Sequence, residues 1–126
     1  MTNARILTID DEPVVTGFIK LLLERAGYSV KEENESTLAL DTIRGFQPNL
    51  VLLDVKMPRL TGHEIAQQIM EDTDLNGTRI LFLTGIDYPN GISIQGHPAP
   101  VPVIKKPVRS EALISTIQSM LACDAN

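Results

Sequence analysis

The hydrophobic residues of this chain are concentrated in short runs with little polar alternation, and a polar residue follows each run. Four such runs begin at Ile6, Leu50, Ile80 and Val101. Uninterrupted runs of this length are typical of parallel strands, because helices cover both faces of a parallel sheet. We therefore predict parallel strands at residues 6–9, 50–54, 80–83 and 101–104, and a further short strand at residues 28–31.

The first helix is predicted directly after the first run. Asp10, Asp11 and Glu12 lead into Pro13, and proline is favoured in the first turn of a helix because its missing amide costs nothing there. Gly27 can end this helix. The side chains expected on its inner face are Val14, Val15, Phe18 and Leu22.

Two more helices are predicted between the strands. Ser36 can cap a helix that ends at Arg44. Its expected inner residues are Leu38 and Ile43, with Leu40 as a further candidate. Thr61 and Glu64 fit a capping box. The helix that this box opens is predicted to bury Ile65 and Ile69.

The stretch between residues 85 and 102 interrupts this alternation of strands and helices. Glycine and proline recur in it at Pro89, Gly91, Gly96, Pro98 and Pro100. These residues weaken a helix, so the fourth helix is expected to be short, distorted or absent. Pro102 indicates that the fifth strand lies at a sheet edge, where a missing amide is tolerated.

The last helix is predicted after Ser110, which can cap it. Its apolar stripe consists of Leu113, Ile114, Ile117, Met120 and Leu121. Strand and helix thus alternate along the chain, and this pattern requires right-handed crossovers. The predicted fold class is α/β, with a doubly wound, five-stranded parallel sheet and helices on both of its faces.

Length and charge narrow the class of protein. The 126 residues suit one domain, and 43% of them are hydrophobic, which is enough for a core of ordinary size. The net charge of -5 comes without a basic face, so direct nucleic acid binding is not expected. With no signal segment and no membrane span, a cytoplasmic protein is expected. Cys123 is the only cysteine, which excludes an internal disulfide, and we assign it no function.

Polar residues follow the predicted strands at one edge of the sheet. Asp10 and Asp11 follow the first strand, Asp54 ends the third, Thr84 follows the fourth and Lys106 the fifth. Because parallel sheets bind ligands beyond the carboxyl ends of their strands, we expect these side chains to gather there. Taken singly, each residue has an ordinary explanation, such as a helix cap or a solvated charge. Together, three carboxylates, a hydroxyl and an ammonium group suit phosphoryl transfer.

Four ordered blocks of sequence resemble the receiver domain of two-component response regulators, over nearly the whole chain. They are Ile9-Asp10-Asp11-Glu12-Pro13, Leu53-Asp54-Val55-Lys56-Met57-Pro58 with Gly62, Leu83-Thr84-Gly85, and Lys106-Pro107. The spacings are also similar to those of the family, with Thr84 30 residues after Asp54 and Lys106 22 residues after Thr84. The resemblance implies a flavodoxin-like sheet in the order 2-1-3-4-5, and a single receiver domain over residues 1–126.

The resemblance further implies that Asp54 is a phosphoacceptor. It would take a phosphoryl group from a phosphohistidine on a sensor histidine kinase or a phosphotransfer protein. Asp11, Asp54 and the carbonyl of Lys56 would hold Mg²⁺, with Asp10 acting through water. Hard oxygen ligands with retained waters are what Mg²⁺ prefers.

By the same resemblance, Lys106 pairs with one phosphoryl oxygen and the Thr84 hydroxyl donates to another. Positioning and charge neutralisation of this kind account for most of the catalysis of phosphoryl transfer. Such a chain is not an enzyme but a signalling domain that assists its own phosphorylation and dephosphorylation, and it acts on a downstream protein. The sequence leaves a homodimer through the last helix open.

Four positions depart from the family pattern or modify it. Val103 stands where many receivers carry an aromatic residue, so an aromatic switch is not expected. Gly85 leaves access to the phosphoryl group open. Lys56 can shield the phosphoryl group from water, and Ile86 offers no polar group to orient a water molecule. We therefore predict slow loss of the phosphoryl group.

Two alternatives belong to other classes. A phosphatase of the haloacid dehalogenase type also uses Asp, Thr and Lys, but it requires a second Asp where this chain has Lys56. A receiver-like module that binds partners without phosphorylation is the other alternative, and the full set of site residues argues against it. His63 and His97 each lack a second imidazole at ligand spacing, so both are expected to be surface residues.

Overall fold

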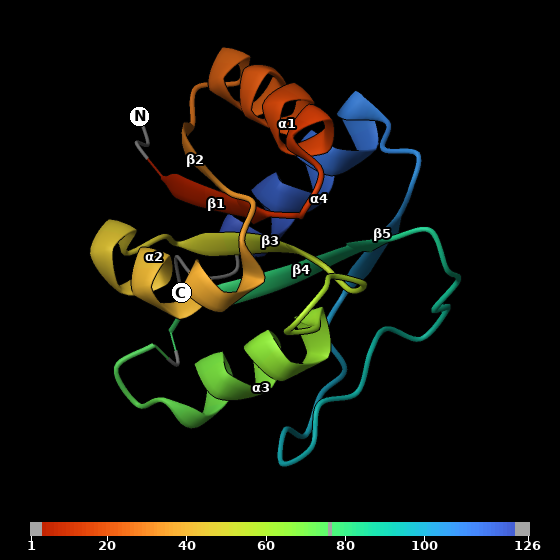
Figure 1. The fold of residues 1–126 in the computed structure, drawn as a ribbon. Coiled ribbons are helices and arrows are strands. Elements are labelled where there is room, and N and C mark those ends of the chain that lie inside the picture. The colour runs from red at the N-terminus through yellow and green to blue at the C-terminus, as the bar shows by residue number, and fades with distance from the viewer. Residues whose placement is uncertain (1–3, 76, 123–126) are drawn as a thin grey trace.

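The computed structural model describes residues 4–75 and 77–122, so Cys123 lies outside the described ranges. Within them the chain forms one five-stranded sheet and four α-helices (Figure 1). The strands are β1 (Arg5–Ile9), β2 (Ser29–Glu33), β3 (Leu50–Asp54), β4 (Arg79–Thr84) and β5 (Val103–Lys105). The helices are α1 (Pro13–Arg25), α2 (Ala39–Phe46), α3 (Gly62–Glu71) and α4 (Ser110–Ala122), and a 3₁₀ turn, Ser36–Leu38, precedes α2. None of these helices has the length and apolar character needed to span a bilayer.

All strand pairs are parallel, and the sheet has the order β2-β1-β3-β4-β5. The register places Ile9 beside Leu53 and Asp54 beside Leu83. The carboxyl ends of β1, β3 and β4 therefore finish at nearly the same level. β5 pairs only with β4 and forms a sheet edge, as Pro102 indicated. The predicted α/β fold and its strand order are confirmed.

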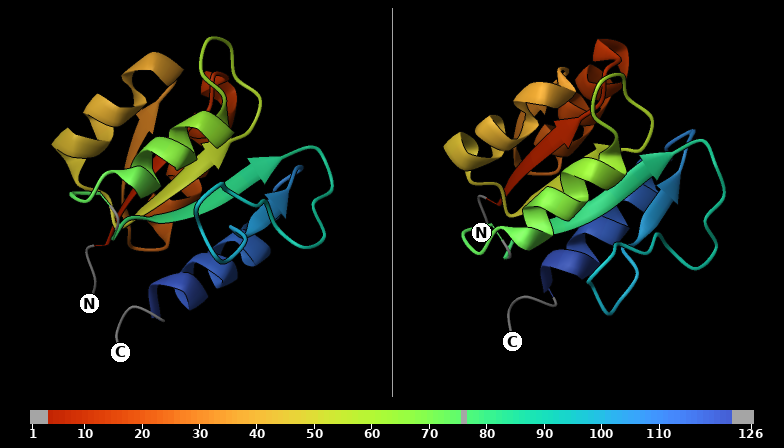
Figure 2. Two further views of the ribbon diagram at one scale, coloured as in Figure 1. Left: turned by 90° about the horizontal axis from the view of Figure 1, so that it is seen from below. Right: turned by 60° about the horizontal axis from the view of Figure 1, so that its bottom comes forward.

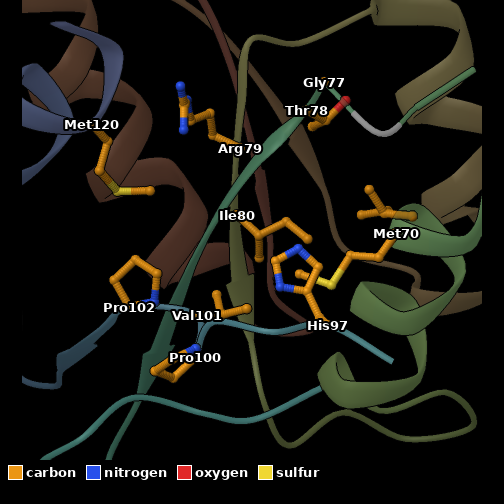
Figure 3. Close-up of a pocket in the computed structure, with 11 residues that line it drawn as sticks. Met70, Gly77, Thr78, Arg79, Ile80, His97, Pro100, Val101, Pro102 and Met120 are labelled. Atoms are coloured by element: carbon orange, nitrogen blue, oxygen red, sulfur yellow. The ribbon is translucent and has the colours of Figure 1, made fainter. Parts of the chain in front are cut away.

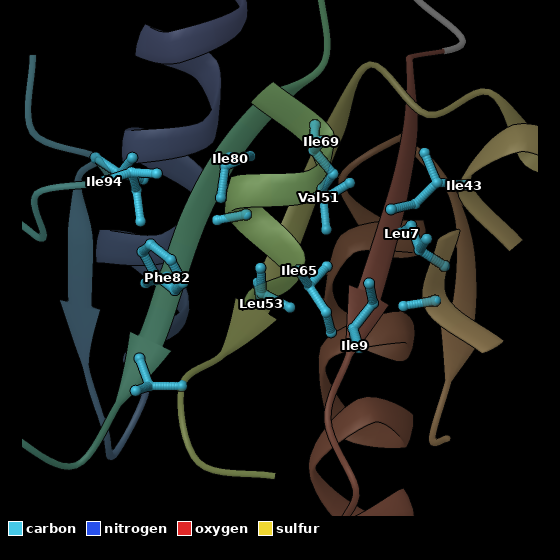
Figure 4. Close-up of a cluster of buried hydrophobic side chains, with 14 of the residues drawn as sticks. Leu7, Ile9, Ile43, Val51, Leu53, Ile65, Ile69, Ile80, Phe82 and Ile94 are labelled. Atoms are coloured by element: carbon cyan, nitrogen blue, oxygen red, sulfur yellow. The ribbon is translucent and has the colours of Figure 1, made fainter. Parts of the chain in front are cut away.

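Two helices cover each face of the sheet. Figure 2 shows α2 and α3 on one face, with α1 and α4 on the other. Alternate strand residues enter two separate buried clusters, and Figure 4 shows the cluster under α2 and α3, which includes Val51 and Leu53. Leu50 and Leu52 belong to the cluster under α1 and α4. Because β3 is buried over its whole length, the strand that carries Asp54 cannot shift without disturbing both clusters.

No helix forms in residues 85–102, in agreement with the sequence-based expectation. The segment instead packs Ile92, Ile94 and Val101 into the cluster under α2 and α3 (Figure 4). An antiparallel bridge joins Ile92 to Val101, with N···O distances of 2.9 and 2.8 Å. Gly91 has a φ of 81°, and a Cβ at this position would lie 2.7 Å from the Val101 carbonyl oxygen. Since Val101 belongs to this bridge, the fifth strand begins two residues later than predicted.

The core-facing side of helix α1 matches only part of the face that its apolar spacing predicted, because Val15 and Leu22 pack against the cluster under α1 and α4 as expected. Val14 is 84% exposed and Phe18 is 52% exposed, although both were expected to be buried. The residues that are buried are Thr16, Ile19 and Leu23. The Thr16 hydroxyl donates to Glu32 Oε1 at 2.7 Å, which holds this polar side chain on the inner face. A prediction that counted only apolar side chains could not include Thr16, and it placed Val14 and Phe18 on the inner face wrongly.

The ends of α1 and α3 agree with the predictions. Pro13 is the first residue of α1. Gly27, with a φ of 101°, ends the helix, and its N–H donates to the Glu24 carbonyl at 3.0 Å. The capping box at the start of α3 is present, because Thr61 and Glu64 each accept the other's backbone N–H. Capping chemistry was therefore readable from the sequence at these helix ends.

The start of α2 differs from its prediction. Ser36 is not a helix cap, because it is the first residue of the 3₁₀ turn and its hydroxyl donates to the Pro58 carbonyl at 2.7 Å. Leu38, which was expected on the inner face, is 49% exposed. The hydroxyl found a partner far away in the sequence, and local capping rules do not consider such partners.

Candidate functional site

The polar residues that follow the strands converge at the carboxyl edge of the sheet. Asp10, Asp11 and Asp54 each place one carboxylate oxygen within 4.8 Å of the other two. Across residues 4–75 and 77–122, this is the one group of three or more acidic, histidine or cysteine side chains close enough to share a metal ion. Asp10 and Asp54 are buried, whereas Asp11 is exposed. The site thus combines two buried carboxylates with one that faces solvent.

The Lys106 ammonium group lies between the two buried carboxylates. Its Nζ is 2.9 Å from Asp10 Oδ2 and 3.4 Å from Asp54 Oδ1. The Lys106 backbone N–H donates to the Thr84 carbonyl at 2.8 Å, which extends the pairing of β4 with β5 and brings the lysine to the site. Burial lowers the pKa of Lys106, but its hydrogen bonds and ion pairs with Asp10 and Asp54 outweigh burial and raise the pKa overall. The lysine is therefore a cation at neutral pH.

The Asp54 carboxyl group has a perturbed pKa. Burial raises this pKa from its ordinary value of 3.8 to about 6, and the negative charge of Asp10 adds to the increase. The charge and hydrogen bond of Lys106 oppose both effects without cancelling them. Asp54 is thus ionised at neutral pH, but its charge is incompletely compensated, and a site of this kind favours the binding of a cation.

An open hollow lies over Asp54. Its lining consists of Asp11, Glu12, Asp54, Lys56, Thr84, Gly85, Ile86 and Lys106. Thr84 is buried, and its Oγ1 accepts the Ile86 N–H at 3.2 Å, which leaves the hydroxyl hydrogen to be donated elsewhere. Lys56 and Ile86, the two positions considered for control of phosphoryl loss, both border this hollow.

Close backbone packing holds the loop that follows Asp54. The Gly62 N–H donates to the Val55 carbonyl at 2.9 Å. A Cβ on Gly62 would lie 2.2 Å from the Asp54 carbonyl oxygen and 2.9 Å from the Val55 Cα. Only glycine allows α3 to begin so close to the end of β3. Gly62 therefore helps to fix the backbone of Asp54 itself.

A set of polar contacts beside the carboxylates was not predicted from the sequence. Asn34 Nδ2 donates to the Asp10 carbonyl at 2.9 Å, and Ser36 donates to the Pro58 carbonyl. Both residues lie in the connection between β2 and α2, which carries no recognisable motif. The available signal was a run of polar residues directly after a strand, at the same sheet edge as the aspartates.

A second hollow lies at the opposite end of β4. Figure 3 shows it between α3, the 85–102 segment and α4, with Ile80, Met120 and Arg79 among the residues of its mixed polar and apolar lining. It includes none of the three aspartates and is separate from the candidate site. His97 also lines it, and its Nδ1 lies 3.1 Å from the Ala99 carbonyl oxygen. His97 is exposed, as expected, whereas His63 is only partly exposed and rests against the Phe82 ring.

A doubly wound parallel sheet with clustered aspartates at its carboxyl edge defines a receiver-like α/β domain. The model of the response regulator receiver domain family matches residues 6–118, and this chain belongs to that family. Members are phosphoacceptor signalling domains of two-component systems, and they typically bind Mg²⁺ at an acidic pocket. Membership also implies interaction with histidine kinases or phosphotransfer proteins.

Individual relatives support this assignment. The chain is 28% identical over 119 residues to protein PilH of Pseudomonas aeruginosa, a match that covers 94% of this chain and 98% of that protein. It is also 29% identical over 124 residues to the DNA-binding dual master transcriptional regulator RpaA of Synechocystis. This match covers 93% of the present chain. The chain spans nearly all of PilH but only 48% of RpaA.

Solved structures agree with the fold. A response regulator receiver domain protein from Clostridium thermocellum superposes with a TM-score of 0.83 at 29% identity, over 97% of both chains. The chemotaxis response regulator CheY4 of Vibrio cholerae superposes with a TM-score of 0.83 at 26% identity, over 94% of this chain and 98% of that one. Both similarities extend over almost the whole length of the present chain.

Proposed function

We propose that this chain is a phosphorylation-dependent signalling module in which Asp54 accepts a phosphoryl group from the phosphohistidine of a histidine kinase or phosphotransfer protein. The observation that carries the proposal is the surroundings of the Asp54 carboxylate. This carboxylate borders an open hollow and lies 3.4 Å from Lys106 Nζ. One of its oxygens lies within 4.8 Å of a carboxylate oxygen of Asp10 and of Asp11. We further propose that residues 1–126 form a single receiver domain.

The acidic group fits a divalent cation. Carboxylate oxygens are hard ligands, which Mg²⁺ prefers, and Asp54 has an incompletely compensated charge. In the proposed site Asp11 and Asp54 hold Mg²⁺ together with the Lys56 carbonyl, and Asp10 acts through water. When bound there, Mg²⁺ supplies positive charge that reduces the repulsion between the carboxylates and an incoming phosphoryl group.

In the proposed transfer, a carboxylate oxygen of Asp54 attacks the phosphorus atom of the phosphohistidine. The P–N bond breaks, its electron pair returns to the imidazole nitrogen, and an acyl phosphate forms on Asp54. Lys106 and Thr84 border the same hollow, and in this proposal they donate hydrogen bonds to two phosphoryl oxygens. The chain thereby assists its own modification without acting as a classical enzyme.

Incubation with Mg²⁺ and acetyl phosphate, followed by intact mass spectrometry, tests the proposed function. The wild-type chain is expected to gain the mass of one phosphoryl group, and Asp54→Ala is expected to gain none. Asp87→Ala is a matched control, because Asp87 is an exposed aspartate that pairs with Lys105 outside the acidic group. No gain in the wild type, or a gain that persists in Asp54→Ala, would favour the phosphorylation-independent interaction module.

We propose that the exposed face of α1 is a docking surface for the phosphodonor. Val14, Phe18 and Leu21 are 84%, 52% and 52% exposed, and their spacing places them in one stripe. Glu12, the residue that precedes this helix, lines the hollow, and the stripe begins two residues later at Val14. A protein that presents a phosphohistidine to Asp54 must contact the surface around the hollow. We therefore include this stripe in the proposed donor interface.

Phe18→Ala is expected to slow phosphotransfer from the donor protein about 10-fold, because exposed aromatic residues often dominate an interface. Phosphorylation by acetyl phosphate is expected to stay at the wild-type rate, since this small donor needs no docking surface. Leu38→Ala is the control, because Leu38 is similarly exposed but lies next to α2 on the other side of the sheet. Equal slowing with both donors would contradict a docking role for Phe18.

Lys56 and Ile86 both border the hollow, and from them we predict a long-lived phosphoryl group. Lys56→Asn and Ile86→Glu are each expected to shorten the lifetime of the phosphorylated chain, by roughly 3- to 10-fold, because they unshield the phosphoryl group or orient an attacking water. The half-life is measured after removal of the phosphodonor. Lys105→Asn serves as the control, because Lys105 pairs with Asp87 and is absent from the lining. Unchanged or longer half-lives in both site variants would refute the prediction.

A further inference from the structure

Residues 33–36, which run from the end of β2 into the 3₁₀ turn before α2, contact both loops that border the site. One contact is to the loop after β1. Asn34 Nδ2 donates to the Asp10 carbonyl at 2.9 Å and to Thr16 Oγ1 at 2.9 Å. The Glu33 carbonyl accepts the Asp10 N–H at 3.1 Å. Neighbouring residues of the connection thus hold both backbone polar groups of Asp10 and leave its carboxylate available to the site.

The other contact is to the loop after β3. Ser36 Oγ donates to the Pro58 carbonyl at 2.7 Å, and Ser36 is only 3% exposed. Loss of a buried hydrogen bond leaves a carbonyl without its partner, which makes this contact costly to remove. Glu35 also pairs with Arg59 of the same loop at 2.8 Å, but this ion pair is exposed and contributes little.

We propose that Asn34 and Ser36 are positioning residues that tie the loop after β1 to the loop after β3. The tie sets the separation between the Asp10–Asp11 pair and the Lys56 carbonyl, which lies between Asp54 and Pro58 in the loop after β3. Only Glu35 lies between the two residues, so the covalent part of the tie is short. The inference rests on the proposed function, because it names residues that hold the proposed Mg²⁺ site in shape.

Charge repulsion gives such a tie a function. Three carboxylates lie within 4.8 Å of one another, and Lys106 pairs with only Asp10 and Asp54. Repulsion between the carboxylates acts to push the loop after β1, which carries Asp11, away from Asp54 when no cation is bound. Mg²⁺ demands a nearly fixed geometry, so a wider separation weakens its binding. Groups that orient metal ligands without touching the metal commonly change metal affinity by 10- to 100-fold.

Isothermal titration calorimetry of the whole chain with Mg²⁺ tests the tie. Asn34→Ala and Ser36→Ala are each expected to weaken Mg²⁺ binding by about 10-fold. The double variant is expected to bind Mg²⁺ about as weakly as either single variant, because one broken end already frees the two loops from each other. Two independent anchors would instead give a double variant whose loss is the product of the two single losses.

Two further variants and a second measurement separate positioning from a general loss of stability. Thr37→Ala removes a hydroxyl that bonds only Glu35 among the contacts described, and it is expected to bind Mg²⁺ like the wild type. Ser36→Thr retains the hydroxyl and is expected to restore affinity. In the metal-free protein, hydrogen exchange is expected to quicken in both alanine variants at the Glu12 amide, which donates to Asp10 Oδ1 at 3.0 Å.

The outcomes are distinct. Unchanged Mg²⁺ affinity in both single variants overturns the tie, and so does a double variant with multiplied losses. Exchange that quickens uniformly along the chain, with no excess at the loop after β1, also overturns it. Each of these results leaves the proposed function standing. A wild-type chain that binds no Mg²⁺ and accepts no phosphoryl group overturns the proposed function itself.

Discussion

Replacing Gly62 with alanine is expected to destabilise the fold by about 3 kcal/mol or more and to suppress phosphorylation of Asp54. The added Cβ would lie 2.2 Å from the Asp54 carbonyl oxygen and 2.9 Å from the Val55 Cα. Both neighbours are backbone atoms at the end of a fully buried strand, so neither can move aside without disturbing the core. Urea denaturation measures the loss of stability as a lower midpoint.

Gly45→Ala is the matched control for this substitution. Gly45 lies inside α2, and a Cβ at this position would meet nothing within 4 Å. Alanine is expected to stabilise the chain there by about 0.5–1 kcal/mol, because it favours the helix and restricts the unfolded chain. The same chemical change therefore has opposite effects at the two positions. A Gly62→Ala variant as stable as the wild type would contradict the close packing of α3 against the end of β3.

Asp54→Asn is expected to be more stable than the wild type at pH 7 without Mg²⁺, by about 2 kcal/mol. The pKa of Asp54 is raised by burial and by Asp10 to about 6 in the folded chain, from an ordinary value of 3.8. The folded chain therefore binds this proton more tightly than the unfolded chain does. Wild-type stability falls as the pH rises from about 3.8 through about 6, and the variant lacks this decrease. Denaturation midpoints across this pH range measure the difference.

The difference is expected to vanish below pH 3.8 and to shrink when Mg²⁺ is added, because a cation that binds only the folded wild type stabilises it. Asp72→Asn is a control for which the expected change in stability has the opposite sign. A hydrogen bond from Arg44 lowers the pKa of Asp72, so this carboxylate stabilises the folded chain at neutral pH and loses that effect as the pH falls. An Asp54→Asn variant that is less stable than the wild type at pH 7 would contradict the prediction.

The strands and the site edge could be predicted because each buried strand ends at a polar residue. The uninterrupted apolar run from Leu50 to Leu53 indicated a strand that is buried on both faces of the sheet. Asp54 was therefore expected at the carboxyl end of that strand, where it lies. Pro102 identified the edge strand, and the glycines and prolines of the 85–102 segment identified the missing helix. In each case a local property of the chain decided the structure. The chemical roles of the site residues remain predictions.

The exposed face of α1 and the connection after β2 could not be predicted in the same way. The inner face of α1 depends on Thr16, whose hydroxyl contacts Glu32 and Asn34 of another element. Ser36 matched a local capping rule but bonds Pro58, which lies 22 residues away. Polar residues with distant partners carry no periodicity, so only the assembled fold reveals them.

The lysine between Asp10 and Asp54 gives the domain an internal counter-ion. Many small metal-binding domains unfold when their ion is chelated, because the free energy of metal binding supplies their folding free energy. Here the Lys106 ammonium group already neutralises part of the acidic group, at 2.9 and 3.4 Å from the two buried carboxylates. The metal-free chain is consequently a folded platform, and under the proposed function an incoming phosphoryl group would exchange one ion pair for another on an existing scaffold.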